Sequence, residues 1–436
     1  MAGRGDRRVP AWTEQERGQA VILATGATWT VAGLATAGVI TRPMRWPEWI
    51  WAVGGAALLV VTGLVPLTAA GGAVAKGLDV YLFLTGMMLL SEAARTHGVF
   101  DWIAALAVNR ARGSTPRLFG LVYLTGVVVT TFMSNDATAV VLTPAVFAVA
   151  RRAEANPLPL LLACALIANA ASFVLPISNP ANLVLYGGHM PPLGRWLGSF
   201  ALPSLVAIVA TYLALRILER SRLQGACACD VAAPTLSREG KAALAGIVAT
   251  AVLLLVVSAL DIELGLPTAL AGIATALFVS VIARASPLAL AKDVSWGVLP
   301  LVAGLFVLVE ALDRTGVIGW VAGLLRAAAA RPVEGAAWAG TILAFGSNLM
   351  NNLPAGLIAS TAVAQSQPPR VMVDALLIGV DLGPNLSVTG SLATILWLQA
   401  IRREGEDVGF WRFLKVGAVA MPVALVAALG VRLAIG

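Results

Sequence analysis

GMMLLSEAARTHGVFDW at residues 86–102 recurs in this chain as GLFVLVEALDRTGVIGW at residues 304–320. At a constant offset of 218, seven of these 17 positions hold the same residue in both copies. Downstream, Met133-Ser134-Asn135 aligns with Met350-Asn351-Asn352, and Ser178-Asn179-Pro180 aligns with Thr389-Gly390-Ser391. These identities exceed what two unrelated apolar segments would share, so the chain is an internal duplication whose halves carry the same features in the same order.

The composition indicates the solvent around this duplicated unit. Of the 436 residues, 58% are hydrophobic and 12% are charged, about half the share of roughly 25% in soluble domains. The mean hydropathy is +0.85. A soluble protein of this length cannot cover so much apolar surface with a polar shell. The composition excludes a cytosolic enzyme, a secreted disulfide scaffold and a disordered chain, and predicts an all-α polytopic membrane protein.

The net charge of +7 comes from 30 basic and 23 acidic residues. The basic residues stand in short gaps between apolar runs, which is typical of membrane proteins that fix their orientation with Lys and Arg. No nucleic-acid partner is therefore expected. The Arg-rich N-terminal tail at residues 1–18 precedes an apolar run that is too long for a cleaved signal, and we interpret that run as the first span.

Apolar runs must reach about 20 residues to cross a bilayer as helices. Eight runs predict full spans, at 19–40, 49–66, 80–97, 196–218, 242–260, 266–283, 295–313 and 413–435. Four more, at 118–151, 157–187, 336–365 and 371–401, are interrupted by Ser, Asn, Asp, Gly or Pro. Backbone at such a break must be buried in protein or line a cavity, and paired breaks in two halves point to the binding site of a transporter.

The two transmembrane repeats are predicted at residues 19–218 and 242–436, with a hydrophilic central loop at 219–241. Each repeat has three spans, a short amphipathic segment (99–112 or 317–331), a re-entrant hairpin, a broken helix and a last span. Because a hairpin makes no net crossing, each repeat crosses five times and the two repeats are inverted. With both termini outside, 19 of the 30 basic residues face the cytoplasm, which the positive-inside rule favours.

The polar residues at the four breaks form the predicted solute site. The hairpin tips and the broken spans would surround one place, where helix ends offer N–H donors and carbonyl acceptors. Such a site suits a small polar solute with several hydroxyl groups or oxygens. The alternative is that these side chains only join helices through hydrogen bonds. The predicted substrate-binding residues are Ser134, Asn135, Ser178, Asn179, Asn182, Asn351, Asn352, Asn385, Thr389 and Ser391.

Asp136 and Asp381 are acidic residues within the breaks, one in each half. An ionisable group inside a bilayer is costly and is a functional hypothesis by default, so we predict that these two carboxyl groups carry the coupled protons. The alternative for each is a fixed charge paired with an arginine. Glu92 and Glu310 are repeat mates near the ends of spans, and an interfacial ion pair with a base three or four residues away is the favoured interpretation there.

The chain lacks the sequence patterns of the common hydrolases. HExxH, GxSxG and GxxxxGK[ST] are all absent, which argues against a zinc hydrolase, a serine hydrolase and an ATPase within this chain. The Cys227-Ala228-Cys229 motif in the central loop can hold a soft metal, but one short CxC is weak evidence. We expect no cofactor and no resident metal, so uphill transport would use an ion gradient or a separate ATPase.

The motif FMSNDA at residues 132–137, followed by VLTP at 141–144, resembles the N-D…L-T-P motif of the arsenite efflux antiporters, the ArsB family of the ion transporter superfamily. The second half resembles this family more closely, through MNNLP at 350–354, DLGP at 381–384 and GSLAT at 390–394. The resemblance extends over nearly the whole chain from about residue 20. Asn385 and Asn169 depart from it, because some members have a base and an acid at these positions.

The resemblance implies a secondary transporter of the bacterial cytoplasmic (inner) membrane that extrudes trivalent arsenite, and antimonite, in exchange for protons by alternating access. It also implies that some relatives associate with a separate arsenical ATPase, and it leaves a homodimer open. The residue chemistry is compatible, because arsenous acid is mainly neutral near neutral pH and presents hydroxyl groups to Asn, Ser and Thr. The alternative is a sodium- or proton-coupled transporter of carboxylates or inorganic anions, although no Arg or Lys lies within the breaks.

Overall fold

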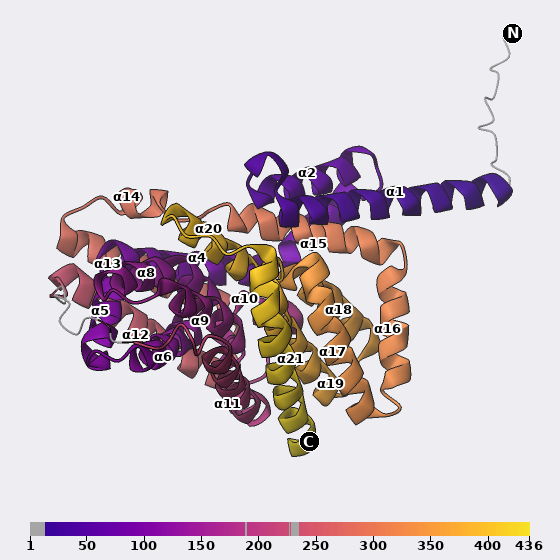
Figure 1. The fold of residues 1–436 in the computed structure, drawn as a ribbon. Helices are drawn as coiled ribbons and strands as arrows, with labels where there is room; N and C mark the ends of the chain where they lie inside the picture. Colours follow the sequence, from indigo (N-terminus) through magenta and orange to yellow (C-terminus); the bar gives the residue numbers. More distant parts are fainter. Residues whose placement is uncertain (1–13, 188–189, 226, 228–234) are drawn as a thin grey trace, which may run out of the picture.

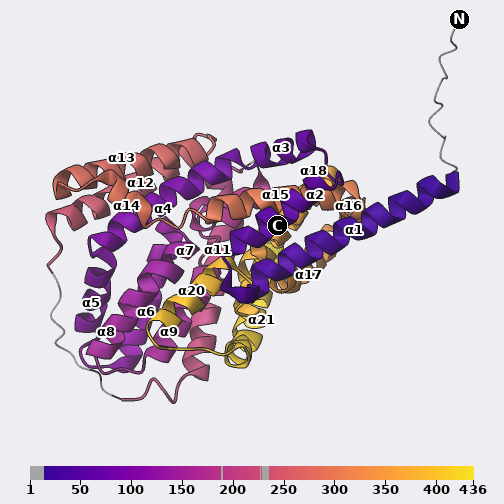
Figure 2. The ribbon, with the colours of Figure 1, turned by 90° about the horizontal axis from the view of Figure 1, so that it is seen from above.

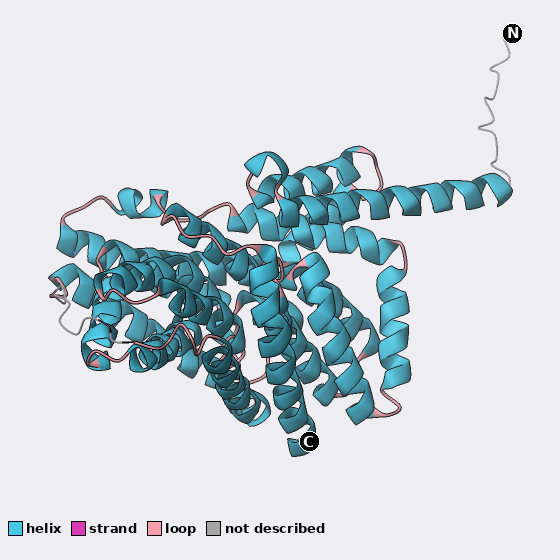
Figure 3. Cartoon of the chain, viewed as in Figure 1, coloured by secondary structure: helices cyan, strands magenta, loops and turns pink. Residues whose placement is uncertain are grey.

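The computed structural model describes residues 14–187, 190–225, 227 and 235–436, and these residues form helices and loops without a β-strand (Figure 3). The first half contains α1 (Glu14–Thr41), η1 (Pro43–Arg45), α2 (Glu48–Val61), α3 (Leu67–Lys76), α4 (Leu78–Thr96), α5 (Val99–Ala111), α6 (Thr115–Met133), α7 (Asn135–Ala137), η2 (Thr138–Leu142), α8 (Thr143–Arg152), α9 (Pro157–Ala170), η3 (Pro176–Ser178), α10 (Pro180–Tyr186) and α11 (Leu193–Leu218). The all-α fold predicted from the sequence is confirmed in this part of the chain.

The second half repeats this order of elements. It contains α12 (Arg238–Ala259), α13 (Gly265–Ala283), α14 (Pro287–Lys292), α15 (Val298–Arg314), α16 (Val317–Ala328), α17 (Pro332–Met350), α18 (Asn352–Ser366), α19 (Arg370–Leu382), η4 (Gly383–Leu386), α20 (Leu392–Arg403) and α21 (Phe410–Ile435). The amphipathic helices α5 and α16 are repeat mates, and they lie at opposite ends of the molecule in both views (Figures 1 and 2). Opposite placement of equivalent helices is what a two-fold relation between the repeats requires.

The two halves pack together through equivalent helices. α4 packs against α13 of the other half, and α15 packs against α2 in the same way. The repeated glycines lie at these contacts: a Cβ on Gly86 would be 2.1 Å from the carbonyl oxygen of Thr268, and a Cβ on Gly304 would be 2.7 Å from the carbonyl carbon of Ala52. The glycine shared by the two sequence copies is therefore explained by close approach of helix backbones.

Six of the described helices are long and apolar enough to cross a membrane: α1 from Gly18, α6, α11, α12, α13 and α21. The pair α3 and α4, bent by 49°, provides a seventh if it is one span. The predicted span 49–66 is shorter as a helix, because α2 ends at Val61 and Pro66 is the N-cap of the separate α3, which begins at Leu67. α6, predicted as one arm of a hairpin, passes the same test of length and composition as the full spans.

The four breaks are brought together by contacts between the halves. The helix α10, which follows the first broken segment, packs against α18 of the second hairpin. Its mate α20 packs against η2, α7 and α8 of the first hairpin. Each broken span therefore contacts the hairpin of the opposite half, and this exchange places all four interrupted segments around one centre.

Candidate functional site

A small cavity of about 10 Å³ lies where the four breaks meet, and we call it the central cavity. Such a volume holds roughly one water molecule. Both hairpin tips, the first residues of α10 and α20, and one residue each of α4 and α15 form its wall: Asn135, Asp136, Asn352, Leu353, Asn179, Pro180, Leu392, Ala393, Leu84 and Val298. The sequence repeat predicts that the hairpin tips and the broken spans meet at one place, and in the structure they do.

Both hairpin tips turn at a non-glycine residue with positive φ. Ser134 has φ 130° and ψ 163°, and its repeat mate Asn351 has φ 75° and ψ 153°. Such backbone conformations cost on the order of 1–3 kcal/mol and persist where the surrounding structure enforces them, often at functional sites. The first tip continues into the π-helical turn η2, whereas the second continues into the regular helix α18. The first hairpin is thus the less regular of the two.

Asn135 and Asn352 contribute buried acceptor atoms to the central cavity. Each is 2% exposed, and neither side-chain oxygen, Asn135 Oδ1 or Asn352 Oδ1, has a hydrogen-bond donor among the described residues. An unsatisfied buried acceptor costs about 1–3 kcal/mol. The backbone N–H of Asn352 donates to the carbonyl of Gly390 (2.9 Å), which fixes the second tip to the broken span of its own half. The wall of the central cavity therefore includes two amide groups whose oxygens lack donors.

Asp136 and Asp381 have different positions relative to this cavity. Asp136 is partly exposed and lines both the central cavity and a large vestibule beside it. Asp381 is fully buried, and its Oδ1 accepts a hydrogen bond of 2.6 Å from Asn179 Nδ2 while its Oδ2 has no donor among the described residues. The other atom of that amide, Asn179 Oδ1, accepts from the N–H of Ala181. Asp381 thus does not line the cavity itself but is hydrogen-bonded to Asn179, which does.

Neither carboxylate forms an ion pair with a base in the described part of the chain, so the alternative of an arginine-paired fixed charge has no partner there. Glu92 and Glu310 differ in this respect. Glu92 accepts from Arg95 at 2.5 and 2.9 Å, and Glu310 pairs with Arg314 at 3.3 Å. The ion-pair interpretation of these two repeat mates is confirmed.

Two predicted site residues of the first broken span bond within the protein. Ser178 Oγ donates to the carbonyl of Thr131 in α6 (2.9 Å), and the Asn182 amide donates to three carbonyls of the preceding loop. Thr389, the repeat mate of Ser178, makes the equivalent bond to the carbonyl of Asn348 in α17 (3.4 Å). These bonds hold each broken span against its own hairpin.

Asn385 and Ser391 lie in a polar network between the halves, and Asn169 stands at its centre. Asn169 Nδ2 donates to Asn385 Oδ1 (3.0 Å), and Ser391 Oγ donates to Asn169 Oδ1 (3.2 Å). Asn385 Nδ2 in turn donates to the carbonyl of Leu166 (3.0 Å). The structure therefore places Asn169, which departs from the family pattern, in contact with the predicted site residues. Asn351 Oδ1 caps the N–H of Leu353 at the second tip.

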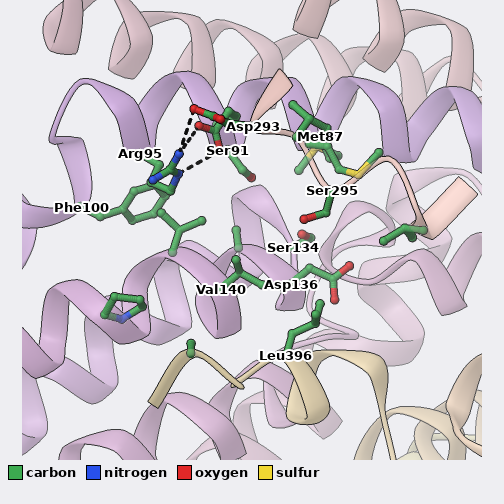
Figure 4. Close-up of a pocket in the computed structure, with 18 of the residues that line it drawn as sticks. Met87, Ser91, Arg95, Phe100, Ser134, Asp136, Val140, Asp293, Ser295 and Leu396 are labelled. Carbon is green, nitrogen blue, oxygen red and sulfur yellow. Dashed lines mark hydrogen bonds and ion pairs between the residues drawn. The ribbon is translucent and has the colours of Figure 1, made fainter. Parts of the chain in front are cut away.

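The large vestibule has a volume of about 730 Å³ and opens beside the first hairpin tip. Figure 4 shows Ser134 and Asp136 near Ser295, apart from the ion pair between Arg95 and Asp293 (3.7 Å). This vestibule includes α5 residues and shares Asp136 with the central cavity. The vestibule and the central cavity therefore adjoin at Asp136.

A smaller vestibule of about 500 Å³ lies between α3, α10, α15 and α18. It includes Asp313 next to the start of α16, so it is placed toward the opposite end from α5 (Figures 1 and 2). Its innermost residues on α10 and α18, Leu183 and Leu357, follow the cavity residues Pro180 and Leu353 by three and four positions. About one helical turn of packed apolar side chains therefore separates this vestibule from the cavity.

A buried ionic group escaped the sequence analysis. Arg432 in α21 donates to Asp374 Oδ2 from Nε (3.0 Å) and Nη2 (2.7 Å), and Tyr186 donates to Asp374 Oδ1 (2.5 Å). Asp374 is fully buried and Arg432 is 3% exposed. Asp374 and Arg432 each lie within an apolar helix, and this placement could have predicted the pair, since charged residues inside a helix bundle usually pair with one another.

Three or more potential metal ligands do not come together among the residues that the structure describes. The backbone N–H of Cys227 donates to the carbonyl of Gly113 (3.0 Å). Cys229 of the CxC motif lies outside the described residues.

Paired hairpins and broken helices that meet between two vestibules define a polytopic membrane transporter. The chain belongs to the citrate transporter family, CitMHS, which matches residues 21–381. It is 28% identical to the arsenical pump membrane protein of Escherichia coli K12, over 87% of this chain and 92% of that protein. An uncharacterized transporter of Mycobacterium tuberculosis H37Rv is also 28% identical, over 80% and 83%. The resemblance to arsenical pumps inferred from the motifs is thereby confirmed.

A solved structure has the same fold. The YdaH transporter of Alcanivorax borkumensis superposes with a TM-score of 0.55, covering 84% of this chain and 87% of its own, at 17% sequence identity. At this identity the likeness concerns the fold, and the chemistry of the site has to be argued from the residues of this chain.

Proposed function

We propose that this protein is a secondary active transporter that extrudes arsenite, and antimonite, in exchange for protons by alternating access. The observation that carries the proposal is the central cavity, where the oxygens Asn135 Oδ1 and Asn352 Oδ1 are buried without donors. Arsenous acid is neutral and presents hydroxyl groups that can donate to both oxygens, but it is larger than the one water molecule that the cavity holds, so its binding requires the hairpin tips to move apart. Pairing of these acceptors removes a penalty of about 1–3 kcal/mol each and so favours binding.

Easy release also fits the lining of the cavity. Its wall contains amide, carboxyl and apolar groups but no cysteine among the described residues. Thiolates bind soft metalloids tightly, and a transporter that gripped its solute through sulfur would release it slowly. An oxygen-lined cavity binds a hydroxylated metalloid through exchangeable hydrogen bonds, which supports turnover.

Asp136 and Asp381 are the proposed proton carriers. Asp136 contacts both the large vestibule and the cavity, so it can exchange protons and meet the solute in the same conformation. Asp381 is sealed behind Asn179, so its exchange requires the opposite conformation. A ligand drives such a change only through different affinities for the two states.

The decisive experiment measures arsenite uptake into everted membrane vesicles with and without an imposed pH gradient. Uptake is expected to need the gradient, and Asp136→Asn is expected to lose at least about 10-fold of the gradient-dependent rate. Asp101→Asn, which alters an acid on the vestibule wall but outside the cavity, is the matched control and should retain it. Gradient-independent uptake by the unaltered protein would refute the proton coupling.

The second candidate is a sodium- or proton-coupled carboxylate transporter, and the name of the matching family, citrate transporter, favours it. Oxygen acceptors also suit a cation such as Na⁺. A carboxylate substrate needs donors or a base, and neither Arg nor Lys lines the central cavity. Sodium-stimulated citrate uptake into the same vesicles, in the absence of arsenite transport, would establish this candidate instead.

The proposed setting is the bacterial cytoplasmic membrane, with both termini outside. The protein would act on arsenite, antimonite and protons, with lipid around it, and a separate arsenical ATPase or a second copy of the chain are partners to be tested by co-purification. A C-terminal reporter that is active only in the cytoplasm should stay inactive after Gly436.

A further inference from the structure

Acidic residues collect on the walls of both vestibules, although the chain as a whole is basic. The large vestibule is lined by five acids and two bases, and the smaller one by four acids and one base. Together the walls hold nine of the 23 acids but three of the 30 bases. The excess of positive charge therefore lies away from the solute path.

Two of the three bases on these walls are neutralised by close partners. Arg95 of the large vestibule is held by Glu92 through two hydrogen bonds. Lys76 of the smaller vestibule pairs with Glu310 (3.2 Å), which Arg314 also contacts from beside the wall. Arg403 of the large vestibule has no ion pair among the described residues, so one of the three wall bases keeps its positive charge against the larger number of acids.

Other acids keep their negative charge toward the vestibules. Asp293 is 63% exposed and only 3.7 Å from the already paired Arg95. Asp79 Oδ1 and Asp313 Oδ1 accept hydrogen bonds from neutral groups, the N–H of Gly265 (2.7 Å) and the amide of Gln365 (2.7 Å). Neutral donors stabilise a carboxylate without cancelling its field, so both vestibules present a net negative potential.

The central cavity shows the same preference independently of the vestibules. Two acceptors at its wall, Asn135 Oδ1 and Asn352 Oδ1, lack donors among the described residues and belong to residues that are 2% exposed. A carboxylate or another anion brings further acceptors and would leave them unsatisfied. A neutral hydroxylated solute or a cation supplies what they lack.

We propose that the acid-lined vestibules are an electrostatic filter that admits neutral hydroxyl-bearing solutes and cations and repels polyanions such as di- and tricarboxylates. This inference rests on the proposed function for its choice of solute and adds the charge class that the path accepts. It also separates this chain from the substrate in the name of its family. Walls of low dielectric constant focus the field of such charges and change local ion concentrations by about 10-fold or more.

The test compares how fast charged thiol reagents label single cysteines placed along the path. The native cysteines are replaced by serine in the full chain, purified in detergent, and Ser295→Cys or Ser360→Cys reports on the large or the smaller vestibule. Cationic trimethylammonium and anionic sulfonate methanethiosulfonates are used. Ser221→Cys, exposed between Arg220 and Arg222, is the basic surface control, and free 2-mercaptoethanol is the uncharged reference. The cation-to-anion ratio of rates at the vestibule positions is expected to be at least about 10-fold higher than that of 2-mercaptoethanol.

Two treatments, replacement of wall acids by amides and addition of salt, test whether the wall charges cause the preference for the cationic reagent. In the Ser295→Cys chain, the pair Asp293→Asn and Glu404→Gln should bring the ratio toward that of a free thiol, as should 1 M salt, where the screening length is about 3 Å. The exposed pair Glu154→Gln and Glu334→Gln, which lies outside both vestibules, should leave it unchanged.

Equal ratios at Ser295→Cys and Ser221→Cys, or a ratio that the wall variants do not move, would overturn the filter. Labelling needs no substrate, so it separates the two proposals. Arsenite transport without a labelling preference refutes the filter alone, and a labelling preference without arsenite transport refutes only the proposed solute.

Discussion

Replacing Asp374 by Asn is expected to lower the free energy of unfolding by about 3–5 kcal/mol, the usual cost of breaking a buried ion pair from one side. Asp374 is fully buried and accepts from Arg432 at 2.7 and 3.0 Å and from Tyr186 at 2.5 Å. The Asn variant keeps the volume but leaves the guanidinium of Arg432, 3% exposed, without its counter-charge.

The size of the effect depends on which partner remains. Arg370 is 3.7 Å from Asp374 but 41% exposed, so it can turn toward solvent, whereas Arg432 cannot. One of its nitrogens, Arg432 Nη1, is already buried without an acceptor. The double variant Asp374→Leu with Arg432→Met removes both buried charges and should recover most of the lost stability, because apolar replacements of buried pairs are often neutral.

The measurement is reversible unfolding of the purified protein in mixed micelles with increasing SDS, followed by tryptophan fluorescence. Asp407→Asn, which breaks an exposed pair with Arg402, is the matched control and should cost about 0–1 kcal/mol. A loss of unfolding free energy below about 1 kcal/mol for Asp374→Asn would refute the reasoning. So would a loss in the double variant that equals the sum of the losses in Asp374→Leu alone and Arg432→Met alone.

Two further predictions concern the polar network and the helix contacts. Asn169→Asp should lower the free energy of unfolding by about 1–3 kcal/mol in the same assay, because it places a carboxylate oxygen against Asn385 Oδ1. The Asn385 amide cannot turn to donate instead, since its nitrogen is bonded to the carbonyl of Leu166. Unchanged stability would mean that the network rearranges freely. Gly86→Ala should destabilise more than Gly304→Ala, since its Cβ would be 2.1 rather than 2.7 Å from facing backbone; the reverse order would contradict the packing argument.

The repeat and the breaks could be predicted because they are local properties of the sequence. A helix of sufficient apolar length, or its interruption by Ser-Asn-Asp, is visible without knowing any neighbour. Helix ends were less predictable. The run 49–66 is largely apolar, yet α2 ends at Val61 and Pro66 is the N-cap of a new helix, since proline is unfavourable in the interior of a helix.

Part of the candidate site could also be predicted from the sequence, and part could not. Asn135, Asp136, Asn179 and Asn352 line the cavity as expected from their places in the breaks. Ser178 and Asn182 were indistinguishable from them by residue type, yet their bonds go to backbone carbonyls. Whether an amide faces a cavity or a carbonyl depends on neighbours distant in the chain, and sequence spacing alone does not contain that information.

The sequence by itself determined the solvent, the duplication, the four interruptions and the residue types available at each. These follow from apolar content and from the cost of polar backbone in lipid. Only the tertiary structure decided that Asp136 opens to a vestibule while Asp381 lies behind Asn179, that Asp374 meets Arg432, and that the acids gather along the path. Each of these depends on contacts between helices far apart in the chain, because electrostatic and hydrogen-bond partners are chosen by distance in space.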